Sequence, residues 1–289
     1  MTDATAADPA QGQAAPAPSR AGRNLPAAIG SGLVLGALVV ATLFVRKEGF
    51  LVLAIVSVSI GVWELVTAFG KGGIHVPLVP SVVGTVSMMT AAYVGGPQAL
   101  AVTFALTCVA VLVWRRADGV QGAARDVSGG MLVAAYPSML AGFSALLLAP
   151  ADGSWRGFVF VLVTVCSDVG GYAVGVTFGK HPMAPSISPK KSWEGFAGSV
   201  LLCVASGIVS VVLIFHRQWW VGLLLGLAVA VSATIGDLVE SLIKRDLGIK
   251  DMSDVIPGHG GLMDRLDSLL VTAPVVWAIL TVFAPLPGG

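Results

Sequence analysis

The sequence predicts an all-α, polytopic integral membrane protein with about nine transmembrane helices. Its residues are 55% hydrophobic and only 11% charged, and the mean hydropathy is +0.86. Soluble domains are usually about 45–50% apolar and about 25% charged. The apolar segments also follow one another with short connections, which indicates one membrane domain rather than a large soluble core.

Each predicted helix must cross a hydrocarbon layer of about 30 Å, which takes roughly 20 apolar residues. Helices are expected because backbone groups cannot stay unpaired in lipid. Only Gly95, Gly96 and Pro97 separate the third segment from the fourth, so we expect a tight antiparallel hairpin there. The predicted segments are 27–45, 50–69, 76–94, 97–114, 131–149, 155–179, 197–215, 219–237 and 268–285.

Basic residues predict the orientation, because cytoplasmic loops of membrane proteins carry an excess of Lys and Arg. With the N-terminus inside and the C-terminus outside, most of the 17 Lys and Arg residues become cytoplasmic. We therefore expect a multi-pass protein of the cell's inner (plasma) membrane. The two most charged loops, 180–196 and 238–267, then share the cytoplasmic face.

The two ends of the chain differ in composition. Residues 1–24 are rich in Ala and Pro and predict a disordered cytoplasmic tail. Residues 25–289 predict a single membrane-embedded domain. The net charge of +1 offers no electrostatic basis for binding nucleic acid.

The most unusual stretch is 241–267, which concentrates ionisable side chains between two apolar segments. Such a cluster either meets a charged ligand or simply lies in water. Its ionisable residues are Lys244, Arg245, Asp246, Lys250, Asp251, Asp254, His259, Asp264, Arg265 and Asp267.

A polar stripe precedes this stretch at the end of the eighth predicted helix. It consists of Asp237, Glu240, Ser241 and Lys244. Steps of three and four residues place these side chains on one helical face. Asp264 and Asp267 likewise share a face where the ninth helix begins. Carboxylates suit Mg²⁺, while Lys and Arg suit phosphate oxygens. The pattern therefore predicts Mg²⁺-dependent binding of a phosphate-rich ligand at the cytoplasmic surface.

The second charged loop has a similar character. Lys190 and Lys191 lie among Ser188 and Ser192, which makes an anion pocket plausible, although lysines there also serve as a topology signal alone. Trp193 is either a stacking platform for a base or an interfacial anchor, and its residue type favours the anchor.

Three acids, Glu64, Asp168 and Asp237, fall inside apolar segments, where charged side chains usually face a polar interior or cavity. Asp168 lies close to a Gly pair that could loosen the helix, and this position favours a functional role for it. For Glu64 the structural alternative is favoured, namely pairing with a buried Arg, Lys or Tyr hydroxyl.

These motifs together resemble the phosphatidate cytidylyltransferase (CDP-diacylglycerol synthase) family. The resemblance covers the motif-bearing part of the chain, roughly 167–267, while the first five segments agree only in hydropathy and position. Three shorter segments, 167–172, 178–180 and 188–195, look like family motifs in the expected order. The matching signature positions are Ser241, Lys244, Arg245, Lys250, Asp251, Ser253, Pro257, His259, Gly260, Gly261, Asp264, Arg265 and Asp267.

The resemblance implies transfer of the cytidylyl group of CTP to phosphatidate at cytoplasmic catalytic loops, giving CDP-diacylglycerol and pyrophosphate. Asp237 and Asp264 would hold Mg²⁺, with Asp267 and Glu240 as further ligands or orienting groups. A second cation nearby, such as K⁺, and a homodimer are implied as well.

The remaining roles follow from the same resemblance. Catalytic contacts would come from Lys244 and His259, besides the two acids that hold Mg²⁺. The substrate-binding set would be Lys191, Ser188, Ser192, Arg245, Lys250, Asp251, Arg265, Asp267, Asp168 and Tyr172. Which cation holds which phosphate stays open.

Two other functions are consistent with parts of the pattern. A related CTP-dependent polyprenol kinase would share the nucleotide and metal chemistry but transfer a phosphate. A transporter would also contain intramembrane acids and Gly-interrupted helices. The absence of an internal repeat pairing the two halves of the sequence argues against the transporter.

Overall fold

The computed structural model describes residues 25–116, 119–249, 252–253 and 261–285, with side chains in the first helix from Val34 onward. The predicted tail 1–24 lies outside the described residues. The elements in chain order are α1 (Leu25–Val45), α2 (Lys47–Lys71), α3 (Leu78–Arg115), α4 (Ala123–Val133), η2 (Ala134–Met139), α5 (Leu140–Leu148), α6 (Gly153–Phe178), β1 (Pro182–Ala184), β2 (Ser188–Ser192), α7 (Trp193–Leu213), α8 (Trp219–Asp246) and α9 (Met263–Phe283).

The described part of the chain contains seven helices that are long and apolar enough to cross a membrane, which confirms a polytopic membrane protein. Here α4, η2 and α5 act as one continuous span. The hydrophobic core forms two clusters, one centred on α2, α3 and α5 and the other on α6, α7 and α8.

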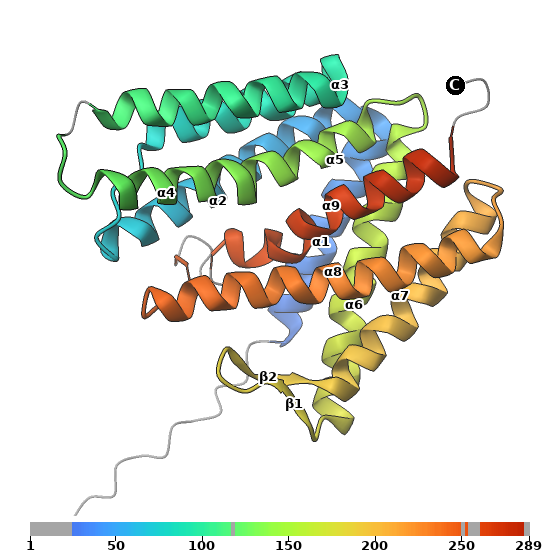
Figure 1. The fold of residues 1–289 in the computed structure, drawn as a ribbon. Helices are drawn as coiled ribbons and strands as arrows, with labels where there is room; N and C mark the ends of the chain where they lie inside the picture. The colour runs from blue at the N-terminus through green and yellow to red at the C-terminus, as the bar shows by residue number, and fades with distance from the viewer. Residues whose placement is uncertain (1–24, 117–118, 250–251, 254–260, 286–289) are drawn as a thin grey trace, which may run out of the picture.

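Helix α9 lies between these two groups of helices (Figure 1). It packs against α8 and α6 on one side and against α5 and α2 on the other. The side chains in the first turn of α9 are therefore held in place by helices from both halves of the chain.

The α3 helix turns back on itself, as the Gly-Gly-Pro sequence predicts. Gly96 has φ 72° and ψ −164°, a conformation open to glycine because it has no Cβ, and Pro97 starts the second arm. Gly84 in the first arm packs directly against the Thr107 side chain in the second. The expected antiparallel hairpin is thus confirmed.

The described residues have the expected all-α fold except in the loop 180–196. Strands β1 and β2 pair there as a short antiparallel hairpin, with Pro182 opposite Ser192 and Ala184 opposite Ser188. A sequence reading based on apolar segments misses these strands because their side chains are mainly exposed or half-buried. The hairpin leads directly into α7.

Several helices also extend beyond their predicted apolar limits. The predicted segment 131–149 begins at Ala123, 219–237 continues to Asp246, and 268–285 begins at Met263. The added turns carry polar groups that pair with neighbouring elements. These tertiary contacts stabilise the helices beyond the points at which their apolar sequence ends.

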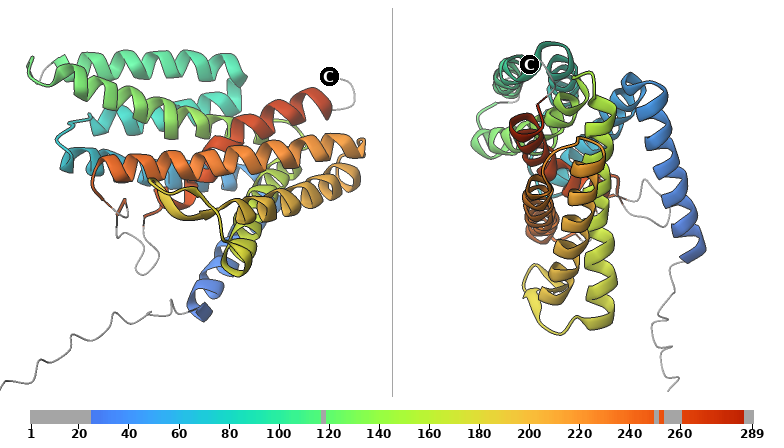
Figure 2. Two further views of the ribbon diagram at one scale, coloured as in Figure 1. Left: turned by 60° about the horizontal axis from the view of Figure 1, so that its bottom comes forward. Right: turned by 90° about the vertical axis from the view of Figure 1, so that its right-hand side faces the viewer.

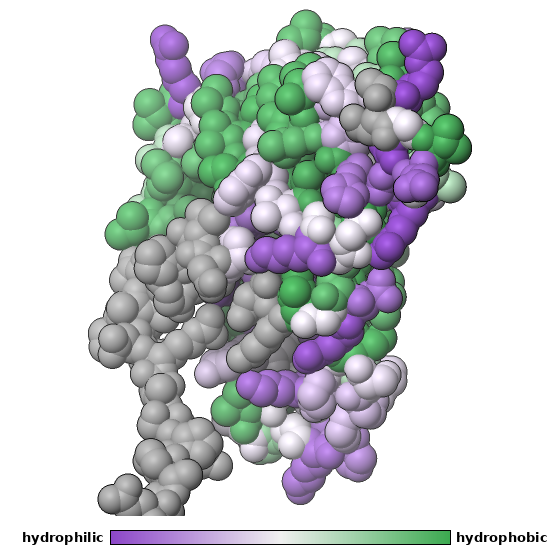
Figure 3. Space-filling model, turned by 90° about the vertical axis from the view of Figure 1, so that its left-hand side faces the viewer, coloured by the Kyte–Doolittle hydropathy of each residue, from purple (hydrophilic) through white to green (hydrophobic). Residues whose placement is uncertain are grey.

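The connections gather at two opposite ends of the bundle. At one end Arg125 donates to the Gly72 carbonyl (2.7 Å), and Arg115 pairs with Asp126 at 2.8 Å. At the other end Arg156 and Arg217 donate to the carbonyls of Ala284 and Pro285. Figure 3 views the first of these ends and shows hydrophilic side chains spread across it.

Helices α6 and α7 approach each other through glycines. A Cβ at Gly170 would collide with the Gly198 carbonyl oxygen, and one at Gly198 would collide with that of Gly170. Small residues at such crossings allow the close packing on which membrane helix association depends. This crossing matters for function because α6 and the start of α7 also form part of the polar cavity described below.

We expect Gly170→Ala to lower stability by about 1–3 kcal/mol, the usual range for overpacking. Thermal unfolding of the detergent-solubilised protein measures it. Gly36→Ala in α1 is the matched control, because a Cβ there meets nothing within 4 Å. Equal unfolding temperatures for the two variants would contradict this account of the crossing.

Candidate functional site

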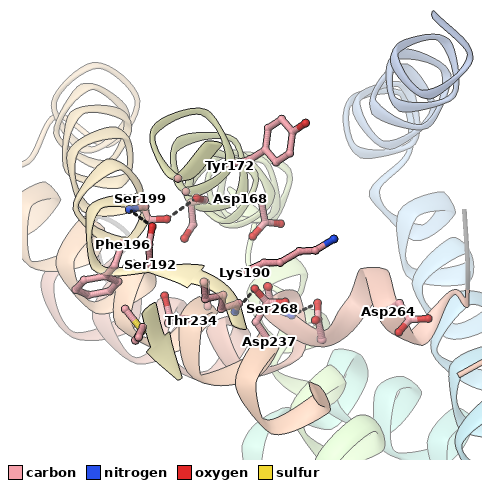
Figure 4. Close-up of a pocket in the computed structure, with 18 of the residues that line it drawn as sticks. Asp168, Tyr172, Lys190, Ser192, Phe196, Ser199, Thr234, Asp237, Asp264 and Ser268 are labelled. Atoms are coloured by element: carbon pink, nitrogen blue, oxygen red, sulfur yellow. Dashed lines mark hydrogen bonds and ion pairs between the residues drawn. The ribbon is translucent and has the colours of Figure 1, made fainter. Parts of the chain in front are cut away.

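A cavity of about 370 Å³ opens where α6, β2, α7, α8 and α9 meet (Figure 4). Most of its polar side chains come from the motifs that the sequence singled out. It is lined by Ser167, Asp168, Gly171, Tyr172, Gly175, Met183, Lys190, Lys191, Ser192, Gly195, Phe196, Ser199, Ala233, Thr234, Asp237, Asp264, Arg265, Asp267 and Ser268.

Four carboxylates from three helices line this cavity. Asp168 comes from α6, Asp237 from α8, and Asp264 and Asp267 from α9. A close approach of α8 and α9 brings two of these helices together: a Cβ at Gly236 would lie 2.5 Å from the Asp267 carbonyl oxygen. Acids separated by about a hundred residues thus share one cavity.

Two lysines neutralise part of this acidic cluster. Lys191 on β2 forms an ion pair with Asp237 on α8. Lys244 on α8 lies between Glu240 (3.0 Å) and Asp264 (2.6 Å), with only 16% of its side chain exposed. Each lysine therefore links two elements and places positive charge among the acids.

Asp264 has a second task at the start of α9. Its Oδ2 atom accepts hydrogen bonds from the Gly261 N–H (2.9 Å) and the Met252 N–H (3.3 Å). Those donors lie on either side of residues 254–260, so the carboxylate joins the two described edges of the signature stretch. The Asp264 carboxylate therefore positions the backbone at Met252 and Gly261, in addition to facing the cavity.

Glu64 on α2 is fully buried and supports the same turn from the opposite side. It accepts hydrogen bonds from the N–H groups of Leu262 (3.0 Å) and Met263 (2.7 Å) and from the Ser253 hydroxyl. The structural interpretation of Glu64 was therefore right, but its partners differ from the expected Arg, Lys or Tyr. It satisfies free N–H groups at the start of α9, where a negative charge also suits the helix dipole.

The remaining predicted residues lie in varied positions. Ser192 lines the cavity, and its hydroxyl caps α7 by accepting from the Gly195 N–H at 3.1 Å. Tyr172 lines the rim, 72% exposed, with its ring turned away from the acids in Figure 4. Arg265 lines the cavity directly. Lys250, Asp251 and His259 lie outside the described residues.

Two predicted ligand-binding residues are not among those lining the cavity. Arg245 Nε donates to the Ile187 carbonyl at 3.3 Å, which ties the end of α8 to the β1–β2 turn. Ser188 pairs with Ala184 at the start of β2. The three residues at the other end of β2, Lys190, Lys191 and Ser192, line the cavity instead of Ser188.

The structure adds polar lining residues that the sequence prediction missed, among them Thr234, Ser268 and Ser199. Thr234 is one helical turn before Asp237, and Ser268 one turn after Asp264, so following each polar face for one more turn finds both. Ser199 carries no such signal: its hydroxyl donates to the Ser167 carbonyl (2.7 Å) across the α6–α7 crossing.

The donor set suits a hard divalent cation, which prefers carboxylate oxygens. Among the described residues no three His, Cys, Asp or Glu side chains already form a closed ligand group. Mg²⁺ needs no such group, since it usually takes one or two carboxylates and completes its shell with water and substrate phosphates. Glu240 Oε1 is buried without a hydrogen-bond partner in the described structure, an acceptor that a cation would satisfy.

These features define a class of protein: a polytopic membrane enzyme whose cavity suits an anionic ligand together with metal ions. The chain belongs to the cytidylyltransferase family, whose model matches residues 26–283. It is 41% identical over 278 residues to the phosphatidate cytidylyltransferase of Mycobacterium leprae, covering 91% of this chain and 89% of that protein.

Other relatives agree. The phosphatidate cytidylyltransferase of Mycobacterium bovis is 39% identical over 292 residues. This match covers 96% of the present chain and 95% of the relative's chain. The phosphatidate cytidylyltransferase of Haemophilus influenzae is 39% identical over a shorter stretch of 122 residues. This stretch covers 40% of the present chain and 42% of the relative's chain. The family resemblance inferred from the motifs is therefore confirmed, and it extends beyond the motif-bearing part.

Glu64→Gln tests the support beneath α9. The amide keeps one acceptor oxygen but puts an NH2 group in place of the other, so either the Leu262 or the Met263 N–H loses its partner, at a cost of about 1–3 kcal/mol. We expect a lower unfolding temperature. Ser59→Ala on the same helix is the control, because the buried Ser59 hydroxyl has no hydrogen-bond partner in the described structure. If Glu64→Gln is as stable as Ser59→Ala, Glu64 does not stabilise the start of α9.

Proposed function

We propose that the protein transfers the cytidylyl group of CTP to phosphatidate, producing CDP-diacylglycerol and pyrophosphate for phospholipid biosynthesis. The observation that carries this proposal is the cavity itself. It joins four carboxylates with Lys190, Lys191 and Arg265 among helices long and apolar enough to span a membrane. Membership of the cytidylyltransferase family supports the same reaction.

In this reaction a phosphate oxygen of phosphatidate attacks the α-phosphorus of CTP. The bond between the α-phosphorus and its bridging oxygen to the β-phosphate breaks, and pyrophosphate leaves. Because the attacking phosphate is already anionic near neutral pH, a strong general base is unnecessary. The main obstacle is the approach of two anions, so positioning and charge neutralisation should dominate the catalysis.

The cations of the cavity would meet these phosphates. Lys190 extends from β2 into the open part of the cavity in Figure 4, and Arg265 lines it from α9. Lys191 holds Asp237 in the described structure and would turn to phosphate once a metal ion takes that carboxylate. Lys244 would stay with Glu240 and Asp264 and keep the acids correctly spaced.

Asp237 and Asp264 are the residues we propose to hold Mg²⁺. Bound there, the ion would neutralise charge on the CTP phosphates and the departing pyrophosphate. Glu240 and Asp267, both almost fully buried, would orient these ligands or hold a second, monovalent cation such as K⁺. Asp168 faces the same space from α6.

For the whole chain we propose nine spans. The two arms of α3 would cross separately, and α1 would add the first crossing to those already described. This count puts the N-terminus in the cytoplasm, the C-terminus outside and the cavity on the cytoplasmic side of the inner membrane. We also propose one catalytic domain over 25–289, a cytoplasmic tail over 1–24 and a homodimer.

Labelled CTP distinguishes this reaction from phosphate transfer by a related lipid kinase. With purified protein, phosphatidate and Mg²⁺, we expect label from the α-phosphate of CTP in the lipid product and label from the γ-phosphate in pyrophosphate. Removing Mg²⁺ with a chelator should prevent the labelling of both the lipid and the pyrophosphate. Lipid that carries the γ-label would overturn cytidylyl transfer in favour of a kinase.

Asp237→Asn tests the metal role. The amide keeps the size of the side chain but removes the charge, so we expect turnover to fall by at least roughly a hundredfold, in the range seen when an electrostatic catalytic group is removed. The unfolding temperature should change little, because the Asp237 side chain is 39% exposed.

The control for this variant is Glu48→Gln, which also removes one carboxylate charge. Glu48 lies in the first turn of α2 and accepts a hydrogen bond from Tyr93 at 3.0 Å, outside the cavity. Its activity should match that of the unmodified protein. Full activity of Asp237→Asn with an unchanged dependence on Mg²⁺ concentration would exclude Asp237 as a ligand.

A further inference from the structure

A second, apolar cavity of about 150 Å³ lies on the other side of α9. Five helices line it: α1, α2, α5, α6 and α9. Nearly all of its side chains are aliphatic or aromatic, and the Ser144 hydroxyl is satisfied by its own helix through the Ala141 carbonyl. Among the described lining residues, Arg265 is the single charged one. We call this cavity the apolar groove.

Arg265 connects the two cavities, since it lines both the polar cavity and the apolar groove. The neighbouring residues of α9 divide between them. Asp264, Asp267 and Ser268 line the polar cavity, whereas Leu266, Leu269, Leu270 and Ala273 line the apolar groove. One helix thus separates the two spaces, and its Arg265 borders both of them.

The apolar groove is bounded on one side by α1, which packs less closely than the other helices. Leu35 contributes to the groove and is still 53% exposed. Figure 2 shows the first half of α1 standing away from the remaining helices. A chain-like ligand can therefore enter from the side that faces lipid, without passing through the polar cavity.

We propose that the apolar groove holds an acyl chain of the lipid substrate while Arg265 contacts its phosphate. An amphiphile with an anionic head and an apolar tail matches this pair of spaces in both charge and polarity. The inference rests on the proposed function and adds to it the place of the lipid tail. It makes the groove, rather than the polar cavity, the determinant of acyl-chain preference.

Ala54→Phe tests the proposal by partly filling the groove from α2. We expect the ratio of KM for dioleoyl to KM for dioctanoyl phosphatidate to rise by roughly tenfold, an effect typical of a changed fit in an apolar pocket. The KM for CTP should stay the same. Val56→Phe is the control, because Val56 lies on the same helix, is 50% exposed and is not part of the groove lining.

The dioctanoyl reaction keeps the two proposals separate. CDP-lipid formation by the unmodified protein supports the proposed function whatever the groove does. If that reaction proceeds but the KM ratio of Ala54→Phe equals that of Val56→Phe, the groove proposal is wrong and the function stands. If the unmodified protein forms no CDP-lipid, the function itself is wrong.

Photocrosslinking covers the case in which Ala54→Phe does not fold. Phosphatidate with a diazirine in its acyl chain should label peptides from α2 and α9 in the unmodified protein, and excess unlabelled phosphatidate should prevent this. Phosphatidylcholine with the same acyl chain should label them much less. Equal labelling by both lipids would identify the groove as a general lipid contact and overturn the assignment.

Discussion

The structure depends most on one buried ionic contact, in which Lys244 lies between Glu240 and Asp264. Their side chains are 16%, 2% and 13% exposed, so all three charges are largely removed from water. Removing one member of such a group leaves an uncompensated buried charge, at a cost of about 3–5 kcal/mol. The contact joins α8 to α9 beside the cavity and orders the acids around it.

The first turn of α9 is held from three directions around that contact. Lys244 reaches Asp264 from α8, Glu64 accepts the N–H groups of Leu262 and Met263 from α2, and Asp264 draws in Gly261 and Met252. A site for two anionic substrates and metal ions needs such preorganised charges, because acids free to move apart would lose their benefit in the reaction. One of these supports, the Glu64 carboxylate, comes from outside the motif-bearing region.

The same helix gives the protein its two chemical environments. Its acids face the polar cavity, which we propose binds phosphate and metal, while its leucines face an apolar groove. A water-soluble nucleotide and a membrane lipid have to meet at one phosphorus atom, which requires polar and apolar spaces side by side. Since Arg265 borders both, it lies where the lipid headgroup would change environment.

The sequence by itself determined the class of protein, the hairpin at Gly96 and the four acids that line the cavity. Hydropathy, glycine conformation and helical spacing are local properties that a single chain displays directly. Only the tertiary structure decided the partners of Glu64, the β1–β2 hairpin and the separate positions of Lys191 and Arg245. Those outcomes depend on which distant groups meet, as when α2 supplies a carboxylate to N–H groups almost two hundred residues later. No local pattern encodes that meeting, because it follows from the packing of α9 between the two halves of the bundle.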